Sequence, residues 1–364
     1  MKFRSEQGML AEALGALSRI ATSRNSSSPA LAGVKLQLND DTLVASSTDN
    51  DISLQFTLSV GGERNGQTLI SARLLNDIVR ALPNGKLTVD VGADSATLSA
   101  GRSQFTVPTL NAVEFPRTTP APANPVTMSA KDLSFALNQV VRAASRDLGK
   151  QHLTAVLLRA EDTGLRLVAT DSYRLAVRDI VGTSVLGFGQ EFLLPSRALG
   201  ELQRLLDANE EIGIRFGDIE ATFETPTMQL TTRIINATFP QFKQLILPKY
   251  DNKLIVAREA LVDALRRSKV LAHDNTTPVR LTMGENGLRI TVQTTDQGAS
   301  TEDVDATFQG NEITAAFNAD YLLDGVDATV GDEVSIESTE PNKPAVIRGV
   351  GDDSYLYLLM PQRV

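Results

Sequence analysis

A threefold internal repeat constrains this chain more than any other feature of its sequence. A Thr-Asp dipeptide follows an apolar, strand-like run three times, at intervals of roughly 120 residues, at Thr48-Asp49, Thr170-Asp171 and Thr295-Asp296. In each copy, one helical pattern precedes the dipeptide and another follows it, in the same order. The chain of 364 residues is therefore expected to fold as three similar modules.

The helical patterns have apolar residues at three- and four-residue steps, which is typical of amphipathic helices. The first helix of each copy is expected at 9–21, 131–147 and 257–269. The second begins with a cap or first-turn residue, at Ser71, Pro195 and Asn318. Alternating β-type runs and turns occupy the rest of each copy, at about eight strands per module.

These patterns predict the fold class α+β, with three repeated modules in which two helices pack on antiparallel sheet. The module boundaries are expected at 1–120, 126–248 and 250–364. The Pro-rich stretch 118–125 is interpreted as a stiff, extended linker between the first two modules.

Composition excludes several classes of protein. The hydrophobic content of 42% with 22% charged residues is that of a soluble globular protein. Cysteine is absent, which removes disulfides and thiolate metal sites and fits a cytoplasmic location. No apolar run is long enough to cross a membrane, and the N-terminal residues do not form a secretory signal.

The sequence contains no recognisable catalytic machinery. There is no nucleophile elbow, Walker loop or dinucleotide fingerprint, and the two histidines, His152 and His273, have no partnered ligand pattern. Asp303 and Asp305 lack the surrounding pattern of a calcium loop. We therefore expect a binding protein or scaffold, with no catalytic residue, no cofactor and no metal.

The stretch ATDSYRLA at 169–176 distinguishes the second copy from the others. The Thr-Asp pair recurs in all three copies, so its expected role is local, with side chains bonding backbone near a strand end. The following Tyr173-Arg174-Leu175 does not recur, because the other copies have Asp51-Ile52-Ser53 and Gly298-Ala299-Ser300 there. This difference indicates a function carried by the second copy alone.

Charge is distributed unevenly along the chain. The net charge is −9, yet the helical segments carry about as many basic as acidic residues, so the negative charge lies in the sheets and loops. The pair Arg73 and Arg80 recurs as Arg197 and Arg204 on the second helix of the second copy. The third copy has Asp320 and Asp327 at the matching positions. Arg142 and Arg146 are expected to share a helix face.

Four separated motifs, ATDSYRLA, FPQFKQLILP, FNADYLLD and YLYLLMPQRV, make the whole chain resemble the family of bacterial β sliding clamps. The resemblance implies that two chains join head to tail as a six-domain ring, with helices lining a hole that duplex DNA passes through. It implies a processivity factor of the replicative DNA polymerase, not an enzyme. Partners would be a second copy, DNA of any sequence, the polymerase, the clamp loader and repair proteins.

The resemblance also assigns sites to this chain. DNA-contacting residues would be Arg24, Arg73, Arg80, Arg142, Arg146, Lys150, Arg197 and Arg204. The head-to-tail joint would bring Phe105 and Val107 of one chain to Val270 and Leu271 of the other. A cleft between modules two and three would bind short partner peptides through Leu153, Thr170, Ser172, Tyr173, Arg174, Leu175, Pro240, Gln244, Leu245, Asn318, Tyr321, Val346, Leu358, Met360, Pro361, Gln362, Arg363 and Val364.

Within the cleft, Tyr173 and Arg174 are expected to form a polar rim that orients the peptide. Ser172, Tyr173 and Gln244 depart from the residues that are common in the family, which bears on partner preference. Two alternatives stay open from the residues alone. One is a hydrolase using Asp171 with Ser172 or His152, and the other is a monomeric three-domain adaptor that never closes around DNA.

Overall fold

The structure, a computed structural model, describes residues 1–21, 28–116, 124–206, 210–272 and 276–363. The chain forms two compact units. The first comprises Met1–Lys131 with Arg204–Ile234, and the second comprises Asp132–Gln203 with Ile235–Val364. The second copy of the repeat therefore contributes strands to both units.

The expected helical patterns are confirmed, because each copy contains two α-helices within the described residues. Their bounds are α1 Gln7–Ile20, α2 Ala72–Ala81, α3 Ala130–Val140, α4 Ser196–Leu205, α5 Arg258–Lys269 and α6 Ala319–Asp327. The buried positions of α1 include Leu10, Leu14 and Leu17, which are fully shielded from solvent. This is the apolar face that its three- and four-residue spacing predicts.

Helix α3 is shorter than the sequence pattern predicts. It ends at Val140 and is followed by a 3-10 turn, Val141–Ala143. The backbone then bonds to nearby side chains, since the hydroxyl of Ser145 accepts from the Asp147 amide at 3.1 Å and Asp147 caps the 3-10 stretch Leu148–Leu153. The expectation that Arg142 and Arg146 share a helix face is therefore wrong.

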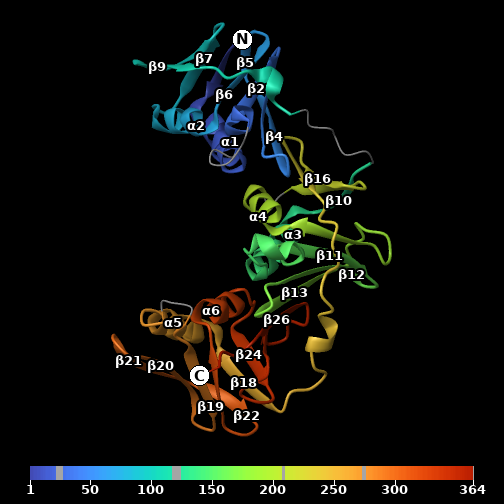
Figure 1. Cartoon of the computed structure of the whole chain (residues 1–364), viewed down its shortest axis with the longest axis vertical. Helices are drawn as coiled ribbons and strands as arrows, with labels where there is room; N and C mark the ends of the chain where they lie inside the picture. Colours follow the sequence, from blue (N-terminus) through green and yellow to red (C-terminus); the bar gives the residue numbers. More distant parts are fainter. Residues whose placement is uncertain (22–27, 117–123, 207–209, 273–275, 364) are drawn as a thin grey trace. The chain divides into compact units, whose positions relative to one another are not determined.

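The first unit contains two antiparallel sheets, and α1 and α2 lie side by side (Figure 1). One sheet has the order β5-β1-β7-β8-β9 and the other the order β10-β15-β16-β17-β4-β3-β2-β6. The strands are β1 Lys2–Glu6, β2 Gly33–Asn39, β3 Thr42–Thr48, β4 Ile52–Ser59, β5 Gly61–Arg64, β6 Gly66–Ser71, β7 Lys86–Val91, β8 Ser95–Ala100, β9 Ser103–Pro108, β10 Val126–Ser129, β15 Glu211–Phe216, β16 Glu220–Glu224 and β17 Met228–Arg233.

The second unit is built in the same way, with a sheet of order β14-β11-β12-β13-β26-β25-β24-β18-β22 and another of order β21-β20-β19-β23. The strands are β11 Ala155–Glu161, β12 Gly164–Thr170, β13 Arg174–Val181, β14 Glu191–Pro195, β18 Asn252–Ala257, β19 Val279–Gly284, β20 Gly287–Thr294, β21 Gly298–Val304, β22 Ala306–Gln309, β23 Ile313–Phe317, β24 Glu333–Ser338, β25 Ala345–Gly349 and β26 Tyr355–Leu359.

Strand pairings between copies explain why the compact units do not follow the repeat. In the first unit β17 pairs with β4, with Met228 opposite Phe56 and Leu230 opposite Leu54. In the second unit β13 pairs with the whole of β26, from Arg174 opposite Leu359 to Arg178 opposite Tyr355. Each large sheet therefore runs without a break from one copy of the repeat into the next.

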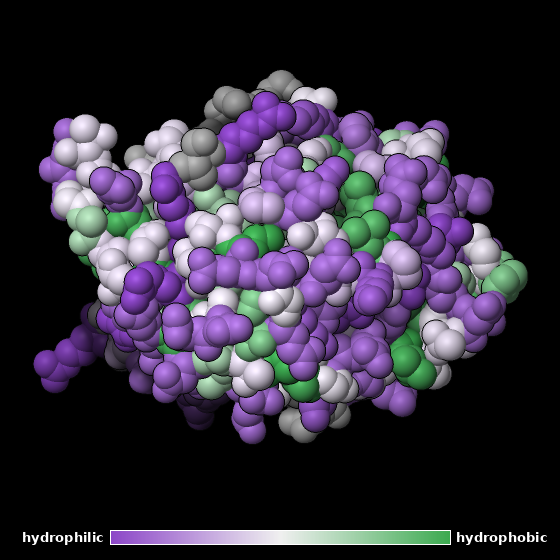
Figure 2. All heavy atoms as spheres, turned by 90° about the horizontal axis from the view of Figure 1, so that it is seen from below, coloured by the Kyte–Doolittle hydropathy of each residue, from purple (hydrophilic) through white to green (hydrophobic). Residues whose placement is uncertain are grey.

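The surface of the molecule is largely hydrophilic in the view of Figure 2, where hydrophobic residues form small separate patches. Among the described residues, no helix is both long enough and apolar enough to span a bilayer.

Helix α6 packs directly onto strand β26 through Gly325. A methyl group at Gly325 would lie 2.4 Å from Cδ1 of Tyr357, whose phenol donates to the Tyr321 carbonyl at 2.9 Å. Gly200 in α4 is different, because a methyl group there would meet Val141 at an ordinary 3.5 Å.

We predict opposite effects of alanine at these two glycines. Gly325→Ala should lower the free energy of unfolding by about 1–3 kcal/mol, because the ring of Tyr357 must move. Gly200→Ala should raise it by roughly 0.5–1 kcal/mol, because it removes backbone freedom without a clash. Thermal unfolding followed by circular dichroism compares the two variants, and equal stabilisation by both would contradict the packing of α6 on Tyr357.

Candidate functional site

The turn between β12 and β13 is built by Thr170 and Asp171. The Thr170 hydroxyl donates to the carbonyl of Arg174 at 2.6 Å. Asp171 Oδ1 accepts from the amides of Tyr173 and Arg174 at 2.9 and 3.0 Å. Ser172, between them, has a φ of 81°, in the left-handed region that side chains disfavour. The result is a tight turn that leaves Tyr173 61% exposed.

The first copy forms the same turn, and the third copy forms a modified one. Thr48 donates to the Ile52 carbonyl at 3.0 Å, and Asp49 accepts from the Ile52 amide at 2.8 Å. The local role expected of Thr-Asp is thus confirmed in two copies. In the third copy the equivalent hydroxyl belongs to Thr294, which donates to Gly298 at 3.0 Å. The assignment of Thr295 as the equivalent residue is wrong, because that loop is one residue shorter.

Arg174 is the centre of a buried polar network. Its guanidinium forms ion pairs with Asp171 at 3.0 Å and with Asp324 of α6 at 2.6 Å. It also donates to the Arg142 carbonyl and lies over the ring of Tyr321, 4.1 Å from its centroid. The side chain is 9% exposed. Arg174 therefore does not stand on an exposed rim, as the sequence suggested, but joins β13 to α6.

The charge state of this network is set by opposing effects. Burial works against the charge of Arg174, but its contacts with Tyr357, Asp324 and Asp171 outweigh it and hold the guanidinium pKa above its usual value. Burial also raises the pKa of the Tyr357 phenol, although the neighbouring Arg174 acts in the opposite direction. Arg174 is thus charged and Tyr357 neutral at physiological pH.

A hydrophobic cluster lies next to this network and joins the second copy to the third. Leu175 of β13, Val346 of β25 and Leu358 of β26 are buried in it together with Phe239 and Phe242. Three of the cleft residues expected from the sequence therefore share one core. Because they are buried, these three residues lie beneath the expected cleft and do not themselves form its exposed surface.

Exposed residues border this cluster. Pro240, Gln244 and Leu245 lie on a segment that ends in the 3-10 turn Lys243–Leu245, and all three are exposed. Met360, just after β26, is 37% exposed, and its amide donates to the Tyr173 carbonyl at 2.8 Å. A second hydrogen bond fixes the described C-terminal residues to β23, because the Gln362 amide donates to the Ala316 carbonyl at 2.8 Å.

The remaining cleft residues differ in exposure. Arg363 is exposed and Pro361, Gln362 and Tyr321 are half-buried, whereas Leu153, Thr170 and Asn318 are buried. Asn318 caps α6 by accepting from the Tyr321 amide at 2.9 Å. Val364 lies outside the described residues, as do Arg24 and His273.

Asp324 and Tyr357 are the site residues that sequence reasoning missed. Asp324 lies in the motif FNADYLLD and Tyr357 in YLYLLM, but their roles follow from their contacts with Arg174. The sequence did contain a signal for Asp324, because a basic residue that a strand buries is expected to pair with a carboxylate, and Asp324 is a carboxylate in the helix α6.

The basic residues expected to contact DNA fall into two groups. Arg73 and Arg80 of α2 and Arg197 and Arg204 of α4 are exposed, as are Arg146 and Lys150. Arg142 is also exposed but lies against two carboxylates, 3.6 Å from Asp324 and 3.4 Å from Asp327, whereas Arg73 has a single longer pair, 3.8 Å from Asp77.

The acidic residues of α6 are neutralised locally. Asp320 pairs with Lys269 of α5, and Asp327 lies 3.8 Å from Arg266 of the same helix. The third copy thus replaces the arginines of the second helix with carboxylates that bind the basic end of the first.

The residues expected at a joint between chains are partly exposed. Phe105, on the edge strand β9, is 41% exposed and Val270, after α5, is 73% exposed. Val107 is buried in its own sheet and Leu271 is half-buried.

The carboxylate that a hydrolase would use, Asp171, is engaged in structural contacts. Asp171 Oδ1 accepts from two amides and Oδ2 pairs with Arg174, so both carboxylate oxygens are engaged. Across the part of the chain that the structure describes, no group of three or more histidine, aspartate or glutamate side chains could hold a metal ion.

Comparisons with known proteins agree along the whole chain. Family models for the N-terminal, central and C-terminal domains of the DNA polymerase III beta subunit match residues 1–119, 127–241 and 243–363. The beta sliding clamp of Streptomyces coelicolor is 31% identical, with all of both chains aligned. That of Synechococcus elongatus is 32% identical over 99% of each chain. The solved DnaN sliding clamp of Bartonella birtlesii, bound to griselimycin, is 28% identical with a TM-score of 0.92, covering all of both chains.

We predict that removing the Arg174 charge destabilises the second unit strongly. Arg174→Met should lower the free energy of unfolding by about 3 kcal/mol, because it leaves Asp171 without its cation and Asp324 with only the more distant Arg142, 3.6 Å away. Arg73→Met is the matched control, since that side chain is 84% exposed, and should change it by less than about 0.5 kcal/mol. Urea unfolding measures both. A loss in Arg174→Met no larger than in the control would show that the network is not structural.

Proposed function

Because the chain belongs to the family of DNA polymerase III beta subunits, the bacterial β sliding clamps, we propose that two copies close into a ring around duplex DNA and tether the replicative polymerase there. The family is a non-catalytic processivity factor, and its three domains follow one another along this chain. The observation that carries the proposal is the end-to-end match with whole clamps.

The grip on DNA would come from enclosure rather than adhesion. The net charge of −9 opposes tight binding of DNA, but a closed ring needs only enough positive charge to let the duplex pass. Exposed Arg73 and Arg80, and their counterparts Arg197 and Arg204, supply such charge at equivalent places on α2 and α4. Arg24, Arg146 and Lys150 would add phosphate contacts, whereas Arg142 would contribute less because two carboxylates of α6 lie against it.

The cleft would hold short segments of partner proteins. Exposed Tyr173, Pro240, Leu245 and Met360 border the hydrophobic cluster and suit a motif with a glutamine, a leucine and a terminal Leu-Phe pair. Methionine adapts to several partners, which fits a surface shared by polymerases, the clamp loader and repair proteins. Docking in this way gives a polymerase a high effective concentration at the DNA.

The joint between chains would be head to tail. Phe105 and Val270 are large apolar side chains left exposed in the single chain, and a head-to-tail joint would cover both. Val107 and Leu271 would support them from beneath. We place the protein in the cytoplasm, because a chain without cysteine suits a reducing compartment.

Topological binding predicts retention that depends on the shape of the DNA. Protein loaded by its clamp loader onto nicked circular DNA should stay bound through a high-salt wash, because screening weakens phosphate contacts but does not open a ring. Cutting the circle should release it within the time needed to slide off an end. Gel filtration of the DNA-bound fraction measures both, and equal loss from circle and linear DNA would favour a monomeric adaptor.

The cleft is tested separately with a peptide that carries the motif. Met360→Ala should weaken peptide binding about tenfold, because an exposed apolar anchor at the centre of a binding site is lost. Phe188→Ala is the matched control, since Phe188 is 83% exposed and lies outside the cleft residues. Fluorescence anisotropy gives the two dissociation constants, and equal effects would argue against the cleft.

A further inference from the structure

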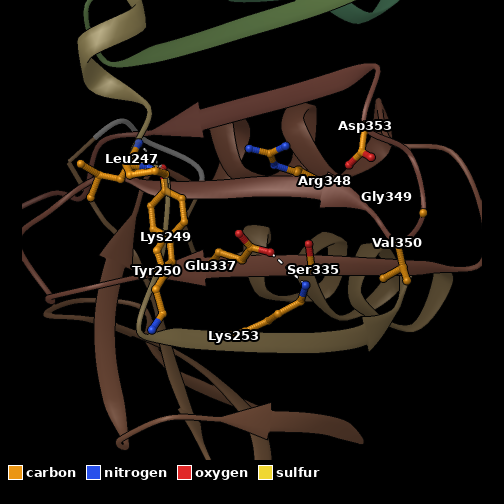
Figure 3. A pocket seen from close by; sticks show the side chains of 12 residues that line it. Leu247, Lys249, Tyr250, Lys253, Ser335, Glu337, Arg348, Gly349, Val350 and Asp353 are labelled. Carbon is orange, nitrogen blue, oxygen red and sulfur yellow. Dashed lines mark hydrogen bonds and ion pairs between the residues drawn. The ribbon is translucent and has the colours of Figure 1, made fainter.

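We propose that a pocket beside the cleft binds an acidic side chain of the same partner segment that occupies the cleft. The pocket has a volume of about 410 Å³ and lies between the segment 247–250 and strands β18, β24 and β25 (Figure 3). Its lining includes Leu247, Lys249, Tyr250, Lys253, Arg348 and Val350. The inference rests on the proposed function and adds a second contact to it.

Arg348 gives the pocket a hydrogen-bond donor that no described residue satisfies. It lies on β25 opposite Ser335, it is half-buried, and its Nε is shielded from solvent without a hydrogen-bond partner. The other arginines that the described strands hold in half-buried or buried positions each have a carboxylate within 4 Å: Arg159, Arg166, Arg174, Arg178 and Arg215. Arg348 forms no such pair within the described residues. A shielded Nε without an acceptor is costly, and a carboxylate bound to the same guanidinium would supply the counter-charge that Arg348 lacks among the described residues.

The neighbouring carboxylates do not fill this role. Glu337 is directed toward Lys253, with which it forms an ion pair at 3.1 Å, as the dashed line in Figure 3 shows. Asp352 is engaged by Arg178 at 3.4 Å. Asp353 lines the pocket but forms no ion pair with Arg348 in the described residues, and Lys249 is a second cation without such a pair there. Because Lys253 and Glu337 neutralise each other, the lining is left with two cations, Arg348 and Lys249, and one carboxylate, Asp353.

The pocket continues the surface that supports the cleft. Val346 and Arg348 are two residues apart on β25, so their side chains leave the same face of the sheet, about 7 Å apart along the strand. Tyr250 packs against the hydrophobic cluster that contains Val346 and also lines the pocket. A partner segment that crosses Leu245 and Leu247 on its way out of the cleft would come to Arg348.

The apolar rim favours a polypeptide occupant over a free anion. Leu247 and Val350 are 43% and 45% exposed, so two large apolar side chains line the pocket together with the cations. An extended peptide can cover such side chains while its acidic residue reaches the guanidinium. A phosphate ion alone would leave them in water.

The test compares three peptides on the full-length protein by fluorescence anisotropy. One carries the cleft motif alone, the second has a short run of glutamates added before the motif, and the third has the same run added after it. One of the extended peptides should bind about tenfold more tightly than the motif alone, as expected for a charge-assisted bond. Arg348→Gln should abolish this gain and leave the affinity for the motif unchanged.

Arg280→Gln is the matched control, because it removes one exposed cation from β19 of the same unit and should keep the gain. The proposal is overturned if neither extension improves binding, if the gain survives Arg348→Gln, or if both variants lose it equally. It is also overturned if inorganic phosphate binds to the protein and loses this binding in Arg348→Gln, while the glutamate extensions do not raise the affinity of the peptide. Failure of the motif peptide itself to bind would instead reject the cleft, so the two results are distinguishable.

Discussion

The antiparallel pairing of β13 with β26 is the constraint on which the site depends. It places Arg174 opposite Leu359 and Leu175 opposite Leu358. Successive side chains of a strand point to opposite faces, so this register sends Leu175 into the hydrophobic cluster and Arg174 toward α6. A shift by one residue would exchange them, placing a guanidinium in the core and a leucine among carboxylates.

The buried network around Arg174 fixes the helix as well as the strand. Asp324 approaches from α6, Tyr357 from β26, and the Arg142 carbonyl from the turn after α3. Elements far apart in the chain are therefore held by one guanidinium. Replacing Arg174 together with its carboxylate partners by apolar residues of similar volume would be milder than removing one charged group, because the cost lies in the buried charge that is left unpaired.

Much of the fold follows from the sequence, because the repeat and the helical periodicity are local or regular signals. The shortened α3 was not predictable from periodicity, since Ser145 and Asp147 compete for the backbone with their own side chains. The shift of the third turn to Thr294 depends on a loop one residue shorter. The pairing of strands from different copies is set by long-range packing, which no local pattern encodes.

The sequence allowed many residues of the site to be identified, but it did not reveal the role of each one. The second-copy motif and the C-terminal strand identify Tyr173, Arg174 and Met360, but a sequence does not reveal that Arg174 is covered by a carboxylate from α6. The turn that exposes Tyr173 depends on Asp171, whose local role was foreseen. Arg348 was not identified from the sequence, because what marks it is a shielded Nε without an acceptor and the lack of an ion pair among the described residues.

The sheets that cross from copy to copy have a consequence for how such a chain can change over evolutionary time. Strand β4 fits β17, and β13 fits β26, so each copy has borders that suit one particular neighbour. The three copies are no longer exchangeable, and a chain with their order shuffled would present mismatched borders. Substitutions in one of these border strands should therefore be accompanied by compensating substitutions in the strand of the neighbouring copy that pairs with it.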